Sequence, residues 1–263
     1  MARIPAPLSP RSAGWWVSEP RLRLDQALEQ RGLSQSRARA RDAVLRGTVR
    51  VNGTVIGKPS HPVAATDILT IDDPAGAYVS RAALKLAAGL DAGDIPVAGR
   101  ICLDLGASTG GFAQVLAERG AARIYAVDVG HGQLSPRVAA LPGIVALEGT
   151  NARDLTPALI PEPVDLVVCD ISFVSVTKVL SAPLALCRRG ADAVILIKPQ
   201  FEVGREHVGK GGIVTDAAAI TRAVDDVVAF MAGLGWSLRH TLPSPIAGGD
   251  GNKEIVALFA RIG

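Results

Sequence analysis

Two lysines and two acids occur at positions where they could share one reaction site. Asp170 and Lys198 each end a continuous apolar run typical of a buried strand, Lys85 lies near the start of a helical pattern, and Glu254 begins the alternating run EIVALFA. A lysine that is partly desolvated and crowded by a second cation loses its proton more readily, and it can then act as a base toward a weakly acidic hydroxyl. We expect Lys198 to be that base, with the two acids holding both lysines in place.

A glycine-rich loop is the second candidate site. In ICLDLGASTGGF, residues 101–112, an apolar run gives way to Gly and Ser before a helical pattern begins, so backbone N–H groups can approach a ligand closely. The spacing Asp-x-Gly-x-Ser-x-Gly differs from the G-x-G-x-x-G of dinucleotide folds. It resembles the first motif of methyltransferases, where an acid suits the cationic amine of S-adenosylmethionine, although such turns also occur as plain structure. The residues expected to bind this cofactor are Asp104, Gly106, Ser108, Gly110 and Gly111.

The elements that must position these residues alternate between apolar strands and amphipathic helices from about residue 80 onward. This alternation predicts an α/β fold with a doubly wound, mostly parallel, Rossmann-like sheet. Ligands of such sheets lie at the carboxyl ends of the strands, around the point where the strand order reverses. The first, second, fourth and fifth predicted strands end at Asp104, Asp128, Asp170 and Lys198. Asp128 is expected to bind ribose hydroxyls there, and the alternative is an ordinary turn acid.

Topology brings two further charges to the same edge of the predicted sheet. A helix that runs back along the first strand sets Lys85 over the carboxyl end of that strand, and a final antiparallel strand that begins at Glu254 starts at this edge. Either residue alone would more often be a surface charge, so the convergence of all four carries the hypothesis. Cys169 directly precedes Asp170, and strand alternation turns its thiol into the packing.

Residues 21–72 have a different pattern, two short helices followed by small strands, which predicts a small α+β domain. Gly32 is expected to end the first helix and Ser34 to cap the second. Asn52 and Gly53 are expected to form the turn of a hairpin. The apolar residues expected to pack from the second helix are Ala38, Ala43, Val44 and Leu45.

Arginines crowd this small domain, with few acids to pair them. Guanidinium groups can bind phosphate in a bidentate manner, so the excess of arginine favours RNA binding, while the alternative is a solvated helix face. The residues expected to contact RNA are Arg23, Arg37, Arg39, Arg41 and Arg46.

Length and composition limit the remaining classes. A chain of 263 residues with a net charge of +3 allows one large domain and one small one. Three cysteines and four histidines lack the spacing of a disulfide framework or metal site, so no metal is expected. The absence of a signal peptide or an apolar span predicts a soluble, cytoplasmic protein without a membrane partner. The predicted divisions are a disordered tail at 1–20, the RNA-binding domain at 21–72, a linker at 73–79 and the cofactor domain at 80–263.

Two resemblances extend this interpretation. The stretch RLDQALEQRGLSQSRARARDAVLRGTVRVNG resembles the alpha-L RNA-binding domain. The chain from about residue 21 to 262 resembles the TlyA family of bacterial ribosomal RNA cytidine 2′-O-methyltransferases, through VSRAALKL, LDLGASTGGF, AVDVGHGQL, TNARDLTP, DLVVCDISFVS, IKPQFEVG, GGIVTD and GNKEI. This resemblance implies an FtsJ-like methyltransferase domain, S-adenosylmethionine as donor and a ribose 2′-hydroxyl of ribosomal RNA, within a ribosomal subunit, as acceptor. It also implies the catalytic set Lys85, Asp170, Lys198 and Glu254, and adds Asn151 to the expected cofactor residues.

Two other functions stand beside the methyltransferase hypothesis, a haemolysin-type protein and a non-catalytic module that binds RNA or the ribosome. A haemolysin would be expected to carry a membrane segment or an export signal, and a binding module would not need the four charged residues. The stretch VGREHVGKGGIVTD places Arg205, His207 and Lys210 between glycines. It suggests a mobile loop that closes over the substrate, or else a merely solvated one.

Overall fold

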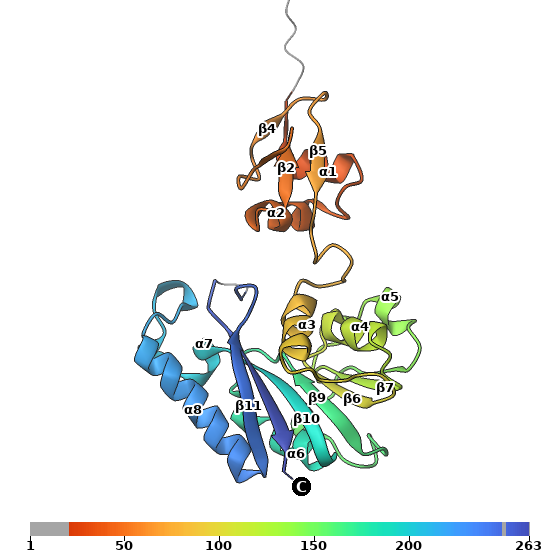
Figure 1. The fold of residues 1–263 in the computed structure, drawn as a ribbon, viewed down its shortest axis with the longest axis vertical. Coiled ribbons are helices and arrows are strands. Elements are labelled where there is room, and N and C mark those ends of the chain that lie inside the picture. The colour runs from red at the N-terminus through yellow and green to blue at the C-terminus, as the bar shows by residue number, and fades with distance from the viewer. Residues whose placement is uncertain (1–20, 249–250, 263) are drawn as a thin grey trace, which may run out of the picture. The chain divides into compact units, whose positions relative to one another are not determined.

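The computed structural model describes residues 21–248 and 251–262. The chain divides into two compact units, Met1–Asp73 and Pro74–Gly263, and each has a hydrophobic core of its own (Figure 1). The predicted tail at 1–20 lies outside the described residues.

The small unit packs two helices against short antiparallel strands. Its helices are α1 (Leu24–Gln30) and α2 (Arg37–Leu45), and its strands are β1 (Leu22–Arg23), β2 (Val49–Val51), β3 (Thr54–Val55), β4 (Pro62–Val63) and β5 (Leu69–Ile71). The strands pair in the orders β3-β2-β5 and β1-β4. Asn52 and Gly53 have φ angles of 49° and 82°, so the predicted hairpin turn is confirmed as one with two left-handed residues.

Two details of helix α2 differ from the prediction. Ser36 rather than Ser34 is its N-cap, since Ser36 Oγ accepts a hydrogen bond from the Arg39 amide. Ala38 and Leu45 were expected to pack but are exposed, because a helix that starts at Arg37 turns them away from α1. The residues of α2 that enter the core are Ala40, Ala43 and Val44.

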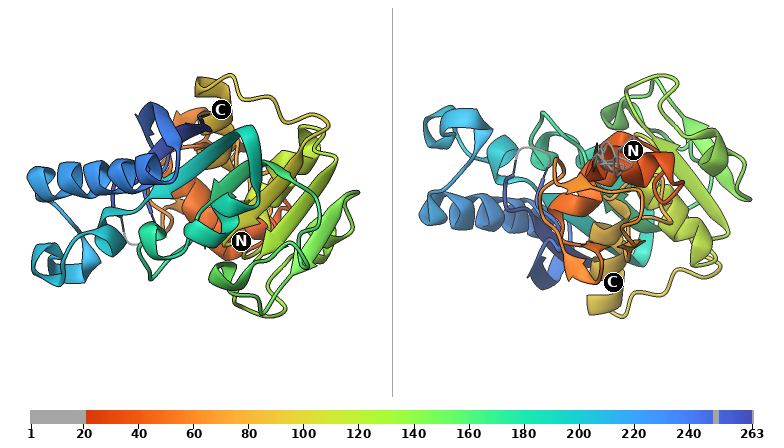
Figure 2. Two further views of the ribbon diagram at one scale, coloured as in Figure 1. Left: turned by 90° about the horizontal axis from the view of Figure 1, so that it is seen from below. Right: turned by 90° about the horizontal axis from the view of Figure 1, so that it is seen from above.

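The large unit is built on a seven-stranded sheet in the order β11-β12-β10-β9-β6-β7-β8 (Figures 1 and 2). The strands are β6 (Ile101–Leu105), β7 (Arg123–Val127), β8 (Ile144–Leu147), β9 (Val164–Cys169), β10 (Cys187–Ile197), β11 (Trp236–Pro243) and β12 (Ile255–Arg261). All neighbours from β10 to β8 are parallel, while β12 is antiparallel to both β10 and β11. The strand order reverses between β6 and β9, so the predicted doubly wound α/β fold is confirmed.

Helices cover both faces of this sheet and form two cores. The helices are α3 (Ala83–Ala92), α4 (Gly111–Glu118), α5 (Pro136–Ala139), α6 (Ser181–Ala185), α7 (Pro199–Glu202) and α8 (Ala217–Gly233). Leu86 of α3 and Leu116 of α4 pack with Cys102 on one face, whereas Leu184 of α6 and Met231 of α8 belong to the core of the other. The shorter 3-10 turns are η1 (Ala152–Asp154), η2 (Val176–Lys178), η3 (Arg205–His207) and η4 (Lys210–Gly212).

Candidate active site

The loop that follows β6 depends on glycine at the strand end. Gly106 has a φ of +79°, and a Cβ there would lie 3.1 Å from the backbone of Ile171. Gly110 has a φ of +95° at the start of α4, where a Cβ would lie 2.8 Å from the side chains of Leu134 and Val138. Both positions combine a left-handed backbone with a close neighbour, so a larger residue would distort the loop.

Asp128 holds this loop against the end of β7. Its Oδ2 accepts a hydrogen bond of 2.8 Å from the Ser108 amide, and its Oδ1 accepts one of 2.8 Å from the Gly130 amide. Each carboxylate oxygen keeps lone-pair capacity for a further donor. Asp128 therefore organises the loop and keeps acceptor capacity free.

A cavity of about 400 Å³ lies at this edge of the sheet. Of the residues expected to bind the cofactor, it is lined by Gly106, Ser108, Asp128 and Asn151. The remaining three lie elsewhere: Gly111 lines a neighbouring cavity, and Asp104 and Gly110 line neither one.

Asp104 lies beneath the loop and lines neither cavity. Its side chain is fully buried on the face of the sheet covered by α3 and α4, because alternation along β6 turns it to the same side as Cys102. Neither carboxyl oxygen has a hydrogen-bond partner of good geometry. Burial, reinforced by the nearby Asp170, raises the pKa of Asp104 to about 8, and the Ala113 amide only partly opposes the rise. Binding of a cationic amine by this acid stays a prediction.

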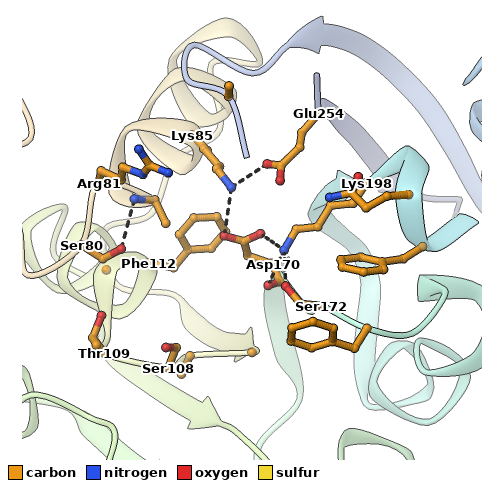
Figure 3. Close-up of a pocket in the computed structure, with 18 residues that line it drawn as sticks. Ser80, Arg81, Lys85, Ser108, Thr109, Phe112, Asp170, Ser172, Lys198 and Glu254 are labelled. Atoms are coloured by element: carbon orange, nitrogen blue, oxygen red, sulfur yellow. Dashed lines mark hydrogen bonds and ion pairs between the residues drawn. The ribbon is translucent and has the colours of Figure 1, made fainter. Parts of the chain in front are cut away.

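The four charged residues meet at the carboxyl edge and form one chain of alternating sign (Figure 3). Lys198 Nζ lies 2.6 Å from Asp170 Oδ1. Lys85 Nζ lies 3.5 Å from Asp170 Oδ2 and 2.6 Å from Glu254 Oε2. No side chain of the four is more than 12% exposed, so these charges interact with little screening by water.

The secondary structure explains why these residues meet. Lys198 and Glu254 directly flank the last register pair of β10 and β12, Ile197 with Ile255. Asp170 follows β9, and Lys85 lies in the first turn of α3. The geometry thus comes from two neighbouring parallel strands, one antiparallel strand and one helix.

Ser172 is a partner of Lys198 that the sequence interpretation missed. Lys198 Nζ donates to Ser172 Oγ at 2.9 Å and to the main-chain oxygen of Asp170 at 3.0 Å. The only signal in the sequence is a hydroxyl two residues after a strand-end acid, which is too common to single out.

A second cavity, of about 440 Å³, is lined by all four charged residues. It shares part of its lining with the cofactor-side cavity, namely Gly106, Ser108, Asp170, Ser172 and Phe173. The two cavities therefore adjoin one another. The charged chain faces the place where two bound molecules could react.

Phe173 is a second residue that the sequence interpretation missed. Its ring is 91% exposed, its φ is +69°, and its centroid lies 5.4 Å from that of Phe201. An exposed aromatic ring in a strained backbone conformation at the border of two cavities is well suited to contact a ligand.

Cys169 is fully buried, and burial raises the pKa of its thiol to about 12. The prediction that it belongs to the packing is confirmed.

The arginine surface of the small unit is more heavily paired than expected. Arg23 and Arg37 both contact the buried carboxylate of Asp25, at 3.0 and 3.2 Å, and the two arginines hold the pKa of Asp25 below its usual value. Arg46 is mostly buried and contacts Asp42 and Asp73. The expectation that few acids pair these arginines is therefore wrong.

Three of the five expected RNA residues nevertheless surround one hollow of about 530 Å³, and these are Arg23, Arg37 and Arg41. The first two remain about half exposed. Arg39 bonds Gln35 on the exposed side of α2, and Arg46 lies outside the hollow.

The loop at 204–214 is joined to the segment before Glu254. Asn252 is buried, donates to the Gly212 carbonyl and accepts from the Val214 amide. His207 Nδ1 lies 3.3 Å from Asp216, the N-cap of α8. Closure of this loop over a substrate stays a prediction.

Comparison with known proteins agrees with this architecture. Residues 78–261 match the FtsJ-like methyltransferase family, and residues 22–69 match the S4 domain. The chain is 48% identical, over 89% of its own length and 88% of the relative's, to the 16S/23S rRNA (cytidine-2′-O)-methyltransferase TlyA of Mycobacterium tuberculosis. It is 36% identical to Hemolysin A of Brachyspira hyodysenteriae, over 90% of this chain and 99% of the relative.

A solved structure from Streptococcus thermophilus, described as a hemolysin, superposes with a TM-score of 0.72 at 33% identity and covers 93% of this chain and 90% of its own. Fold and site thus define an FtsJ-like methyltransferase unit joined to an S4 domain. The chain belongs to the TlyA family. No helix in the described part of the chain is long and apolar enough to cross a membrane.

Proposed function

We propose that the protein transfers a methyl group from S-adenosylmethionine to the 2′-hydroxyl of a cytidine ribose in ribosomal RNA. The observation that carries the proposal is the buried chain Lys198, Asp170, Lys85 and Glu254 at the border of two cavities. Burying four charges is costly, and packing alone would be served as well by apolar residues. The printed name of the Mycobacterium tuberculosis relative supports the same reaction.

The cofactor-side cavity fits S-adenosylmethionine. When bound, this molecule supplies an electrophilic methyl group and leaves as a neutral thioether that needs no proton. Gly106 allows close approach of the backbone, Asp128 has acceptor capacity left for ribose hydroxyls, and Asn151 lines the same cavity. The apolar side chains of Ile171 and Val179 offer packing for a flat base.

The charges around each lysine indicate which one is the base. Lys85 lies between two carboxylates, whereas Lys198 contacts one carboxylate and two neutral acceptors, one of which is the Ser172 hydroxyl that lines both cavities. We therefore assign Lys198 as the base. It takes the proton of the 2′-hydroxyl, and the oxygen forms its new bond to the methyl carbon. Lys85 stays charged and stabilises the developing negative oxygen.

The small unit supplies RNA affinity. The hollow with Arg23, Arg37 and Arg41 offers guanidinium groups to backbone phosphates. In the large unit, Phe173 offers a face on which a base can stack. Since ribosomal RNA is the proposed substrate, we expect the protein to act in the cytoplasm.

Mapping of methylated riboses tests the proposal. Ribosomal RNA that lacks the modification is incubated with the protein and S-adenosylmethionine, and 2′-O-methylation is located by its resistance to alkaline cleavage. We expect methylation of a cytidine ribose, unchanged in the control Lys178→Arg, whose lysine is exposed and outside both cavities. Methylation of a base, or no methylation of any ribosomal RNA or subunit, would refute it.

A further inference from the structure

All three positions around the Lys198 amine are taken by protein acceptors. Nζ lies 2.6 Å from Asp170 Oδ1, 3.0 Å from the Asp170 main-chain oxygen and 2.9 Å from Ser172 Oγ. An ammonium group has three N–H donors, of which two donate to the Asp170 main-chain oxygen and Ser172 Oγ, while Asp170 Oδ1 neutralises the charge as a close ion pair. The neutral amine has two N–H groups and one lone pair, and one of the three oxygens must then face that lone pair.

Only one of these oxygens can become a donor. A main-chain carbonyl oxygen has no hydrogen, and an ionised carboxylate only accepts. The Ser172 hydroxyl can rotate, accepting a hydrogen bond from the ammonium and donating one to the amine. The neutral form of Lys198 therefore directs its lone pair at Ser172.

Lys198 itself lines one of the two cavities, and of its three partners the Ser172 hydroxyl is the most open to both. The Lys198 side chain is only 8% exposed, whereas Ser172 is exposed and lines both cavities. In Figure 3, Ser172 lies at the lysine amine on the side away from Lys85, while the Asp170 carboxylate lies between the two lysines. A hydroxyl bound in either cavity can therefore approach Ser172 Oγ.

We propose that Ser172 relays the proton from the substrate hydroxyl to Lys198, an inference that rests on the proposed function. The 2′-O–H bond breaks as a new Oγ–H bond forms, and the original Oγ–H bond breaks as the third Nζ–H bond forms. Serine ends the step neutral, Lys198 ends it as an ammonium, and the substrate oxygen keeps the electron pair that bonds the methyl carbon. The ammonium finds all three acceptors in place.

Three proteins test the relay, namely wild type, Ser172→Ala and Ser172→Thr, with single-turnover methylation as the readout. Base catalysis contributes typically about 100-fold or more, so Ser172→Ala should be slower by about that factor. Ser172→Thr keeps the hydroxyl and should stay within about tenfold of wild type. Ser172 also lines the cofactor-side cavity, so calorimetry measures S-adenosylmethionine affinity in all three, and methylation is compared at saturating cofactor to isolate the chemical step.

Mixtures of H2O and D2O add a readout that a packing role would not change. Plotted against the fraction of D2O, the wild-type rate should fall along a curve, because two protons move together. The residual rate of Ser172→Ala should fall along a straight line, because only one proton then moves.

A loss below tenfold in Ser172→Ala overturns the relay, as does a straight line for wild type. Two results together would also overturn the relay. These are a loss of activity in Ser172→Thr and, in Ser172→Ala, a residual rate that depends on the D2O fraction along the same curve as wild type. Failure of the wild-type protein to methylate a 2′-hydroxyl would instead refute the proposed function. An inactive Lys198→Arg beside a fully active Ser172→Ala would reject the relay alone.

Discussion

The two charged regions of this protein differ in how deeply their charges are buried. At the strand ends of the large unit, four charges alternate in sign within one buried chain, and every side chain is positioned by a strand end or a helix turn. In the small unit, half-exposed arginines gather around one buried acid, Asp25. Buried charges act through individual contacts, whereas exposed charges act through a screened field. Substitutions in the first region should have large, discrete effects, and those in the second should have small effects that depend on salt.

The largest effect is expected for Asp170→Asn. This change leaves two buried lysines without the carboxylate they share, and breaking a buried ion pair costs about 3–5 kcal/mol of unfolding free energy. Urea unfolding measures that cost, and methylation should also be lost. The matched control is Asp91→Asn at the exposed pair with Arg119, where we expect about 1 kcal/mol or less. Similar losses of unfolding free energy in the two variants would show that the buried and the exposed ion pairs do not differ in their contribution to stability.

A second expectation concerns Asp104 and pH. Its folded pKa of about 8 lies above that of an unfolded Asp, about 4, so the folded state keeps a proton that the unfolded chain releases between these values. This contribution to stability is full below pH of about 4 and is lost as pH rises toward 8, by up to about 1.4 kcal/mol per pH unit. Asp104→Asn should remove this part of the slope of unfolding free energy between pH 5 and 8. Parallel slopes for the variant and wild type would mean that Asp104 is ionised in the fold.

Asp128→Ala should weaken S-adenosylmethionine binding by about tenfold or more, the equivalent of one hydrogen bond to a charged group. The variant loses the acceptor of the Ser108 and Gly130 amides and the acceptor proposed for the ribose. Calorimetry measures the affinity, and circular dichroism checks the fold. An unchanged dissociation constant would place the cofactor elsewhere.

The smallest effects belong to the arginine surface. Arg37→Ala and Arg41→Ala should each weaken RNA binding a few-fold, and each should reduce the slope of log affinity against log salt by about one. Arg46→Ala should instead lower the unfolding free energy of the small unit, because Arg46 pairs with Asp42 and Asp73. A changed salt slope in Arg46→Ala, with unchanged slopes in Arg37→Ala and Arg41→Ala, would contradict this assignment. It would mean that Arg46 binds phosphate and that Arg37 and Arg41 do not.

The sequence was sufficient to predict the fold and the meeting of the charged residues, because both follow from topology. Apolar strands alternating with helices imply a parallel sheet, and strand ends of such a sheet share an edge. Asp170 and Lys198 were placed by that rule, and Glu254 by a final antiparallel strand that starts at the same edge.

Details set by side-chain direction were not predictable in this way. Asp104 is turned under α4 by the alternation of a strand that ends one residue later, and Arg46 meets Asp73 only after the chain folds back. The positions of Ser172 and Phe173 depend on a turn whose conformation no periodicity encodes.

The identity of the base is the central claim, and single-turnover methylation of ribosomal RNA by Lys198→Arg and Lys85→Arg tests it most directly. Arginine keeps the charge of either lysine but cannot lose its proton near neutral pH. We predict that Lys198→Arg binds S-adenosylmethionine normally and loses methylation by about 100-fold or more. Lys85→Arg should be milder, since its role is to supply charge between two carboxylates. Substantial activity in Lys198→Arg would contradict the account and show that another group takes the proton.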